Sequence, residues 1–167
     1  MSNTQNPYLL DTNVFIEAAK HYYAFDLAPS FWEDLVSNAK KGCILSINKV
    51  KAELDEKEDR LKQWTNDDFV QWFEPVYATD VLGEYDKIMK WVEESDFVDK
   101  AKKDFADYNK ADAWIVAYAK AKGCVVVTHE KYRPGRKHKI QIPNACEIFG
   151  VRSVDTFQML RELGIQL

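Results

Sequence analysis

The sequence has few cysteines, no long apolar run and no strong excess of charge of either sign. Cys43, Cys124 and Cys146 are an odd number at wide separations, which excludes the paired spacing of zinc and redox motifs and predicts small buried side chains. No stretch approaches the roughly 20 apolar residues of a membrane span. The polar first seven residues lack the charge and the apolar run of a signal peptide. These absences predict a cytoplasmic protein with no membrane partner.

What is present is typical of a globular protein. Of the 167 residues, 46% are hydrophobic and 13% are aromatic, which is enough to build a core in one compact domain. The chain contains neither an internal repeat nor a linker. We therefore expect a single domain over residues 1–167.

The net charge of -4 argues against nucleic acid as a partner, but the charge is distributed unevenly along the chain. Residues 51–99 contain 15 acidic and 6 basic residues, whereas residues 100–139 contain 11 basic and 4 acidic residues. The densest basic part is residues 131–139. Two interpretations stay open: a solvated loop, or a surface that binds phosphate groups.

Apolar patterns predict three buried strands, at residues 8–10, 43–47 and 124–128, that alternate with helices. This order indicates an α/β protein whose mostly parallel sheet is covered on both faces. Residues 55–105 form an acidic helical segment, which we interpret as an insertion or cap. The expected helices begin near Val14, at a capping box at residues 30–33, at Asn48 and at Asn66, the last of which buries Phe69, Trp72 and Phe73. Further helices are expected from Thr79 or Asp80 to Trp91, from Asp96 or Asp99 to Phe105, over residues 111–122 and over residues 155–163, and Pro143 with Asn144 opens a short one. A short strand is expected at residues 139–142.

Four acidic residues stand where strands end or helices begin. Asp11 follows the first strand, Glu53 lies in the helix after the second, Asp112 begins a helix, and Glu130 comes just after the third strand. In open α/β sheets, ligands bind beyond the carboxyl ends of the strands. Clustered carboxylates repel one another unless cations neutralise them, and hard cations such as Mg²⁺ and Mn²⁺ prefer oxygen ligands. The pattern therefore predicts a metal cage suited to phosphodiester hydrolysis.

Each acid also has a simpler interpretation. Asp11 and Asp112 can serve as helix caps, Glu53 belongs to an acidic helix, and Glu130 can be an exposed loop residue. Asn13 and Thr128 are candidates for orienting the acids, with ordinary turn chemistry as their alternative. His129 is left out of the catalytic set, because strand alternation places it on the side opposite to Glu130.

Several sequence blocks resemble the PIN domain, and in particular its bacterial branch related to VapC-type toxins. These blocks are LLDTNVFIEA at residues 9–18, ADAWIVAYAKAKGC at 111–124, VVVTHE at 125–130 and IPNACEIFGV at 142–151. The resemblance implies a three-layer α/β/α sandwich with a central, mostly parallel sheet. It also implies an endoribonuclease that depends on Mg²⁺ or Mn²⁺ and hydrolyses RNA by activating a water.

The resemblance assigns roles to individual residues. Asp11, Glu53 and Asp112 match the first three acids of the family. Glu130 stands where the family commonly has aspartate, so its longer side chain is a departure. The basic residues expected to hold the RNA backbone are Lys110, Lys131, Arg133, Arg136, Lys137 and Lys139. By analogy with the toxin branch, an antitoxin partner and a homodimer are also expected.

Two other functions remain open. A degenerate module would bind RNA or a protein without cleavage. The longer side chain of Glu130 and the acidic surroundings of Glu53 are the reasons for considering it. A phosphatase would use Asp11 as a nucleophile, but such enzymes generally need a second aspartate two residues later. Asn13 occupies that position.

Overall fold

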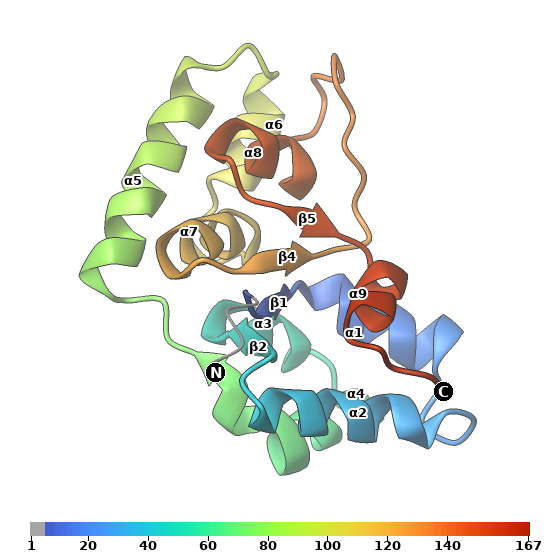
Figure 1. Ribbon diagram of the computed structural model, residues 1–167. Coiled ribbons are helices and arrows are strands. Elements are labelled where there is room, and N and C mark those ends of the chain that lie inside the picture. Colours follow the sequence, from blue (N-terminus) through green and yellow to red (C-terminus); the bar gives the residue numbers. More distant parts are fainter. Residues whose placement is uncertain (1–5) are drawn as a thin grey trace.

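The protein contains one five-stranded sheet in the order β3-β2-β1-β4-β5 (Figure 1). The structure is a computed structural model and describes residues 6–167. All four strand pairs are parallel. In the register, Tyr8 of β1 pairs with Ile44 of β2 on one side and Val125 of β4 on the other. The strands are β1 Tyr8–Leu10, β2 Ile44–Ile47, β3 Phe73–Glu74, β4 Val125–Val127 and β5 Ser153–Val154.

Helices cover both faces of the sheet, so the predicted three-layer α/β/α architecture is confirmed (Figure 1). Helix α7 packs on β4 and α5 packs on the outside of α7, whereas α2 packs against β2. The α-helices are α1 Thr12–Glu17, α2 Pro29–Lys40, α3 Asn48–Leu54, α4 Arg60–Trp64, α5 Thr79–Glu94, α6 Asp99–Phe105, α7 Asp112–Lys122, α8 Ile142–Phe149 and α9 Thr156–Glu162. Two π-helical turns, η1 Ala18–Tyr22 and η2 Thr65–Phe69, and a 3₁₀ turn, η3 Val70–Trp72, join them.

The core is built around strands β1 and β4 and helix α7, which is buried over most of its length. Every residue of β1 and β4 is buried, as expected for parallel strands that have helices on both sides. Residues 113–119 of α7 are also buried, with Trp114 completely so. A helix that is apolar all round must lie inside the protein. The first residue of α7, Asp112, is therefore held in place by a rigid element.

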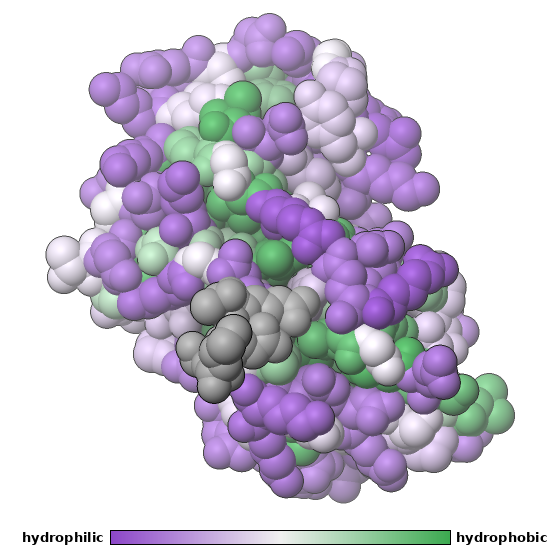
Figure 2. Space-filling model, viewed as in Figure 1, coloured by the Kyte–Doolittle hydropathy of each residue, from purple (hydrophilic) through white to green (hydrophobic). Residues whose placement is uncertain are grey.

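The surface is mostly hydrophilic on the face shown in Figure 2, where apolar residues show mainly between the layers. Among residues 6–167, no helix combines the length and the apolar character needed to cross a bilayer.

Cys124 and Cys146 are buried, as predicted, whereas Cys43 is only half-buried.

Several predicted element boundaries are wrong. Helix α2 begins at Pro29 without a side-chain cap, because proline already has the backbone angle of a first helical residue, so Ser30 is not the cap. Residues 139–141 are not a strand, and Ile142 opens α8. The acidic segment 55–105 contributes the edge strand β3 to the sheet, whereas we expected Phe73 within a helix.

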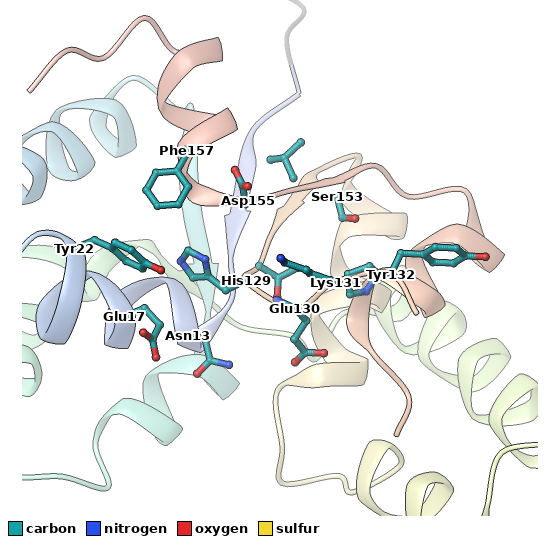
Figure 3. A pocket seen from close by; sticks show the side chains of 13 residues that line it. Asn13, Glu17, Tyr22, His129, Glu130, Lys131, Tyr132, Ser153, Asp155 and Phe157 are labelled. Carbon is teal, nitrogen blue, oxygen red and sulfur yellow. The ribbon is translucent and has the colours of Figure 1, made fainter. Parts of the chain in front are cut away.

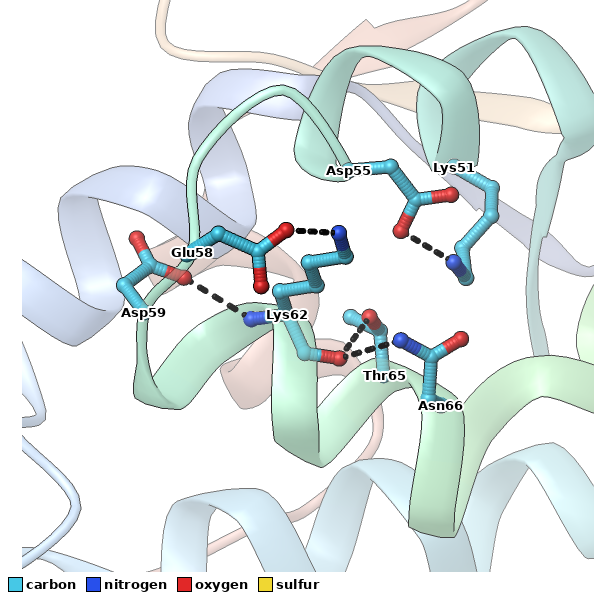
Figure 4. Close-up of polar contacts among 7 residues, drawn as sticks. All are labelled: Lys51, Asp55, Glu58, Asp59, Lys62, Thr65 and Asn66. Carbon is cyan, nitrogen blue, oxygen red and sulfur yellow. Dashed lines mark hydrogen bonds and ion pairs between the residues drawn. The ribbon is translucent and has the colours of Figure 1, made fainter.

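The segment before β3 shows why this boundary was missed. Helix α4 starts after Asp59, which accepts a hydrogen bond from Lys62 N at 2.9 Å. The side chains of Thr65 and Asn66 donate to the carbonyl oxygen of Lys62 at 2.9 and 3.0 Å (Figure 4). Side chains that compete for a helical carbonyl disturb the regular ladder, and here the chain changes to π-helical and then 3₁₀ turns. Asn66 therefore lies inside the helical segment and does not open it.

Candidate active site

Asp11 lies at the carboxyl end of β1 and is fixed by neighbouring groups. Its side chain is 2% exposed, Oδ1 accepts from Thr12 N at 2.7 Å, and Oδ2 accepts from Thr128 Oγ1 at 2.8 Å. Burial raises its pKa well above the usual range, as do the charges of Asp112 and Glu130, while the two hydrogen bonds lower it. Asp11 is thus a buried acid held in a defined orientation beside two others.

Glu53 joins three elements at the same edge of the sheet. It lies on α3 and is half-buried. Oε1 accepts from Thr12 Oγ1 at 2.5 Å, and Oε2 accepts from Ala111 N at 2.9 Å, at the start of α7. This environment differs from that of its acidic neighbours, since Asp55 pairs with Lys51 and Glu58 pairs with Lys62 at the surface (Figure 4). Glu53 is therefore not a solvated surface acid.

Asp112 is the first residue of α7, but it does not cap the helix. The cap position is Ala111, and no side-chain capping hydrogen bond is formed there. Burial, followed by the charges of Glu130 and Glu53, raises the pKa of Asp112 to about 7, while the charges of Lys139 and Lys110 lower it. Burial is the main cause of this raised pKa, and the charges of Glu130 and Glu53 add to it. The interpretation of Asp112 as a simple cap is not supported.

Glu130 is the acid whose charge acts on the most neighbours. It follows β4, is half-buried, and its Oε1 accepts from Ile142 N at 2.9 Å, at the start of α8. Its charge contributes to the raised pKa of Asp11 and of Asp112, and also to that of Cys146, which burial mainly raises to about 12. The longer side chain thus reaches the acids even though it comes from beyond the strand end.

Asp112 interacts electrostatically with each of the other three acids, and Asp11 also interacts with Glu130, but the four acids do not form a closed cage. Among the residues that the structure describes, no three His, Cys, Asp or Glu side chains meet in the arrangement of a metal site. Glu53 and Glu130 each accept a hydrogen bond from a backbone N–H. Mg²⁺ needs only one or two direct carboxylates and keeps several waters, so this set of oxygen donors suits a hard cation.

The residues expected to orient the acids differ in their positions. Thr128 is 2% exposed, donates to Asp11, and accepts from Glu130 N at 3.1 Å. Asn13 is exposed, and within residues 6–167 the hydrogen bonds to the Asp11 carboxylate come from Thr12 and Thr128. The threonine is thus the residue that contacts the acid, whereas the asparagine faces solvent.

The basic residues fall into three sets. Lys110 and Lys139 are exposed and act electrostatically on Asp112, and Lys139 Nζ lies 3.9 Å from Glu130 Oε2. Lys137 pairs with Asp96 at 2.8 Å, so its charge is partly neutralised on the far side of this loop. Three further basic residues are exposed, namely Lys131, Arg133 and Arg136.

A cavity of about 670 Å³ opens beside Glu130 (Figure 3). Thr128 and Glu130 line it on the side of the acids, and Tyr22, His129 and Phe157 line it on the other. His129 turns toward the two aromatic rings, and Glu130 turns away from them (Figure 3). The expected opposite orientations of residues 129 and 130 are therefore observed, although both border one cavity.

The sequence matches the family model described as "Domain of unknown function (DUF4411)" over residues 8–167. The chain belongs to this DUF4411 family. No curated protein matches it.

Two solved structures have a similar fold to this DUF4411 chain. The crystal structure of VapBC2 from Rickettsia felis bound to a DNA fragment from their promoter contains a chain with a TM-score of 0.53 and 19% identity, covering 89% of this chain and 97% of that one. The crystal structure of FitAcB from Neisseria gonorrhoeae gives a TM-score of 0.51 and 14% identity, with coverages of 87% and 95%. The DUF4411 chain thus has the VapC-like PIN-domain fold.

Sequence reasoning missed some residues of this DUF4411 site. Thr12 holds both Asp11 and Glu53, and its signal was its position directly after Asp11. Glu17 lies one helical turn after Asn13, and both line the cavity. Tyr22 and Phe157 gave no signal, because a π-helical turn and the terminal helix bring them to the cavity.

Proposed function

We propose that the protein is a metal-dependent endoribonuclease that hydrolyses RNA phosphodiester bonds. The observation that carries this proposal is the buried Asp11 at the carboxyl end of β1, whose pKa burial raises together with the charges of Asp112 and Glu130. Carboxylates from separate segments raise one another's pKa at the sheet edge where open α/β proteins bind ligands. Such mutual repulsion is relieved by a bound cation.

Asp11, Asp112, Glu53 and Glu130 are the residues that would hold Mg²⁺ or Mn²⁺. When bound, a divalent cation supplies charge neutralisation and Lewis-acid activation of water and phosphate. Thr12 and Thr128 keep the Asp11 carboxylate oriented toward the other acids. Glu53 ties the start of α1 to the start of α7 through its two oxygens, so the acids keep their relative positions.

Basic residues beside the acids suit an anionic substrate. Lys110 and Lys139 place positive charge near Asp112. Lys131, Arg133 and Arg136 extend this charge along the exposed loop, with Lys137 at its paired end. Contacts of such side chains with phosphates bind single-stranded RNA without reading its sequence. Hydrolysis by water would leave a 5′-phosphate and a 3′-hydroxyl.

The likeness to chains of VapBC2 and FitAcB supports a toxin role for the same site. We propose that an antitoxin protein occludes the acidic edge of the sheet and that the protein forms a homodimer. A cytoplasmic location accords with an RNA substrate.

A second candidate is a module that binds RNA or a protein without cleavage. Two observations favour it: Glu53 and Glu130 are occupied by backbone N–H groups, and no three acidic side chains meet among the described residues. Cleavage assays separate the two candidates.

The test compares Asp11→Asn with native protein on labelled single-stranded RNA, with Mn²⁺ and with EDTA. We expect native cleavage only with the metal, and a loss on the order of a hundredfold or more in Asp11→Asn. Asp86→Asn, an exposed acid on α5, is the matched control and should cleave normally. Equal cleavage by native protein and Asp11→Asn would reject the proposal, and no cleavage by native protein would favour the binding module.

A further inference from the structure

The cavity next to Glu130 has an aromatic wall that the carboxylates do not use. The ring of Tyr22 lies 5.8 Å from that of His129, with an angle of 26° between the planes. The ring of Phe157 meets Tyr22 edge-on, at 5.2 Å and 90°. These rings come from η1, from the segment after β4 and from α9, and they form one side of the cavity (Figure 3).

The wall is held in place while one ring remains accessible. Thr156 Oγ1 lies 3.0 Å from His129 Nε2, which fixes the orientation of the imidazole. Tyr22 is 52% exposed although it contacts both other rings. An exposed aromatic face on a fixed support is suited to stacking against a flat ligand, and every nucleobase is such a ligand.

The polar groups around this wall are mainly hydrogen-bond acceptors. Glu17 and Asp155 line the same cavity, and ionised carboxylates only accept hydrogen bonds. Asp155 Oδ1 accepts from Gln158 N at 2.8 Å, and its second oxygen has no hydrogen bond within residues 6–167. Glu17 has a 3.7 Å contact with His21 Nδ1. Adenine, cytosine and guanine present an exocyclic amino group with two N–H donors to such acceptors, whereas uracil presents a single ring N–H between two carbonyl oxygens, which carboxylates repel.

Lys131 also lines this cavity (Figure 3). Lys131 is exposed and directly follows Glu130. It is therefore close to the nucleotide that would follow a phosphate bound at the acids. Asn13 lines the cavity between the acids and Glu17, and its carboxamide both donates and accepts. The cavity thus combines the Glu130 carboxylate, the Asn13 amide and the Lys131 ammonium with the aromatic wall and its two acceptors, Glu17 and Asp155.

We propose that this cavity binds one nucleobase of single-stranded RNA, stacked on Tyr22, and selects bases with an exocyclic amino group over uracil. This inference rests on the proposed function for the identity of the ligand as RNA. It adds a specificity-determining site that is separate from the acids. Tyr22 provides the stacking surface, and Glu17 and Asp155 provide the discrimination.

The test measures binding rather than cleavage, in the Asp11→Asn protein. Fluorescence anisotropy with 5′-labelled hexamers of adenylate and of uridylate gives the two dissociation constants. We expect adenylate to bind roughly threefold or more tightly than uridylate. Adding Tyr22→Leu should weaken adenylate binding by roughly a factor of five or more, since the stacking face is lost. Tyr22→Phe keeps the ring and should bind as before, which controls for folding together with the thermal midpoint.

Glu17→Gln tests the source of the discrimination. A carboxamide can donate to a uracil carbonyl and repels it less, so the ratio of the two constants should fall toward one. Equal affinities of the two hexamers, an unchanged constant in Tyr22→Leu, or no binding of either hexamer would overturn the inference.

The outcome is distinguishable from failure of the proposed function. If native protein does not cleave RNA but the Tyr22 and Glu17 effects appear, the nuclease proposal fails and the base site stands. If cleavage depends on Asp11 but Tyr22→Leu binds and cleaves like Tyr22→Phe, the base site fails and the nuclease stands.

Discussion

The surroundings of each acidic side chain separate the candidate site from the rest of an acid-rich protein. Asp55 and Glu58 have lysine partners at the surface, whereas Asp11 is buried and receives its hydrogen bonds from a backbone N–H and a threonine. A buried carboxylate without a cationic partner costs free energy when it is charged. The acids at this edge therefore lower the stability of the metal-free protein above neutral pH.

Asp112 makes this cost measurable. Its pKa is about 7 in the folded protein. An aspartate in an unfolded chain has a pKa of about 4, so the folded state holds the proton more tightly than the unfolded state. The tighter binding of this proton stabilises the folded state. This contribution to the free energy of unfolding is present in full below about pH 4 and is lost as pH rises to about 7. In EDTA, the free energy of unfolding of Asp112→Asn should increase relative to that of native protein as pH rises over this range. The difference should reach at most about 4 kcal/mol at pH 8.

Urea unfolding at pH 4.5 and pH 8 checks this expectation. Asp86→Asn is the control, since it is exposed on α5 and should follow native protein at both values. A difference between Asp112→Asn and native protein that does not grow with pH would contradict the assigned environment of Asp112.

Thr128 offers a second test at this scale, because its hydroxyl donates to Asp11 and accepts from Glu130 N. Thr128→Val keeps the shape and removes both bonds, and should lower Mn²⁺ affinity by about 10- to 100-fold, as for groups that orient metal ligands. Thr128→Ser keeps the hydroxyl and should retain most of the affinity. Calorimetric titration measures both, and equal affinities of the valine and serine variants would show that Thr128 does not orient the acid.

At the scale of elements, the sequence predicted the long and strongly patterned segments well. Helix α7, strand β4 and the terminator Gly123 all lie close to their expected positions. Strands β3 and β5 have two residues each, too few for any periodic pattern, and only their neighbours in the sheet define them. The prediction of a helix that begins at Asn66 was wrong, because side-chain hydrogen bonds to the carbonyl oxygen of Lys62 determine the local helix type.

Two glycines in helical segments give a matched prediction. Gly123 ends α7 with φ of +73°, a conformation that strains other residues, whereas Gly83 lies within α5 without a positive φ. An added Cβ meets nothing within 4 Å at either position. Gly123→Ala should therefore destabilise by about 1–2 kcal/mol, and Gly83→Ala should stabilise by about 0.5–1 kcal/mol. Thermal and urea unfolding measure both, and the same sign for the two variants would be inconsistent with the backbone angles.

At the scale of the whole molecule, four distant segments meet because the strands are parallel. The ends of β1, β2 and β4 lie at one edge of the sheet, so Asp11, Asp112 and Glu130 become neighbours across more than a hundred residues. This convergence could be predicted from strand and helix boundaries. The hydrogen bonds of Glu53 and the aromatic wall at Tyr22 could not, since they depend on side-chain packing between elements.

The same convergence predicts a response of the whole fold to metal. A cation that binds the folded state alone stabilises it, by about 2.7 kcal/mol at a hundred times its dissociation constant. Mn²⁺ should therefore raise the thermal midpoint of native protein and of Asp86→Asn. Asp11→Asn should show a higher midpoint in EDTA, because a buried charge is gone, and little further rise with Mn²⁺. A metal-induced rise of equal size in Asp11→Asn would place the bound metal elsewhere.

Anomalous diffraction from crystals soaked in Mn²⁺ tests the central claim most directly. If the acids at the carboxyl edge of the sheet are a metal centre, the anomalous map will contain a peak at coordination distance from the Asp11 carboxylate, with Asp112 or Glu130 completing its shell directly or through water. A map whose manganese peaks all lie away from Asp11 and Asp112, at a concentration that saturates the protein in solution, would contradict the account.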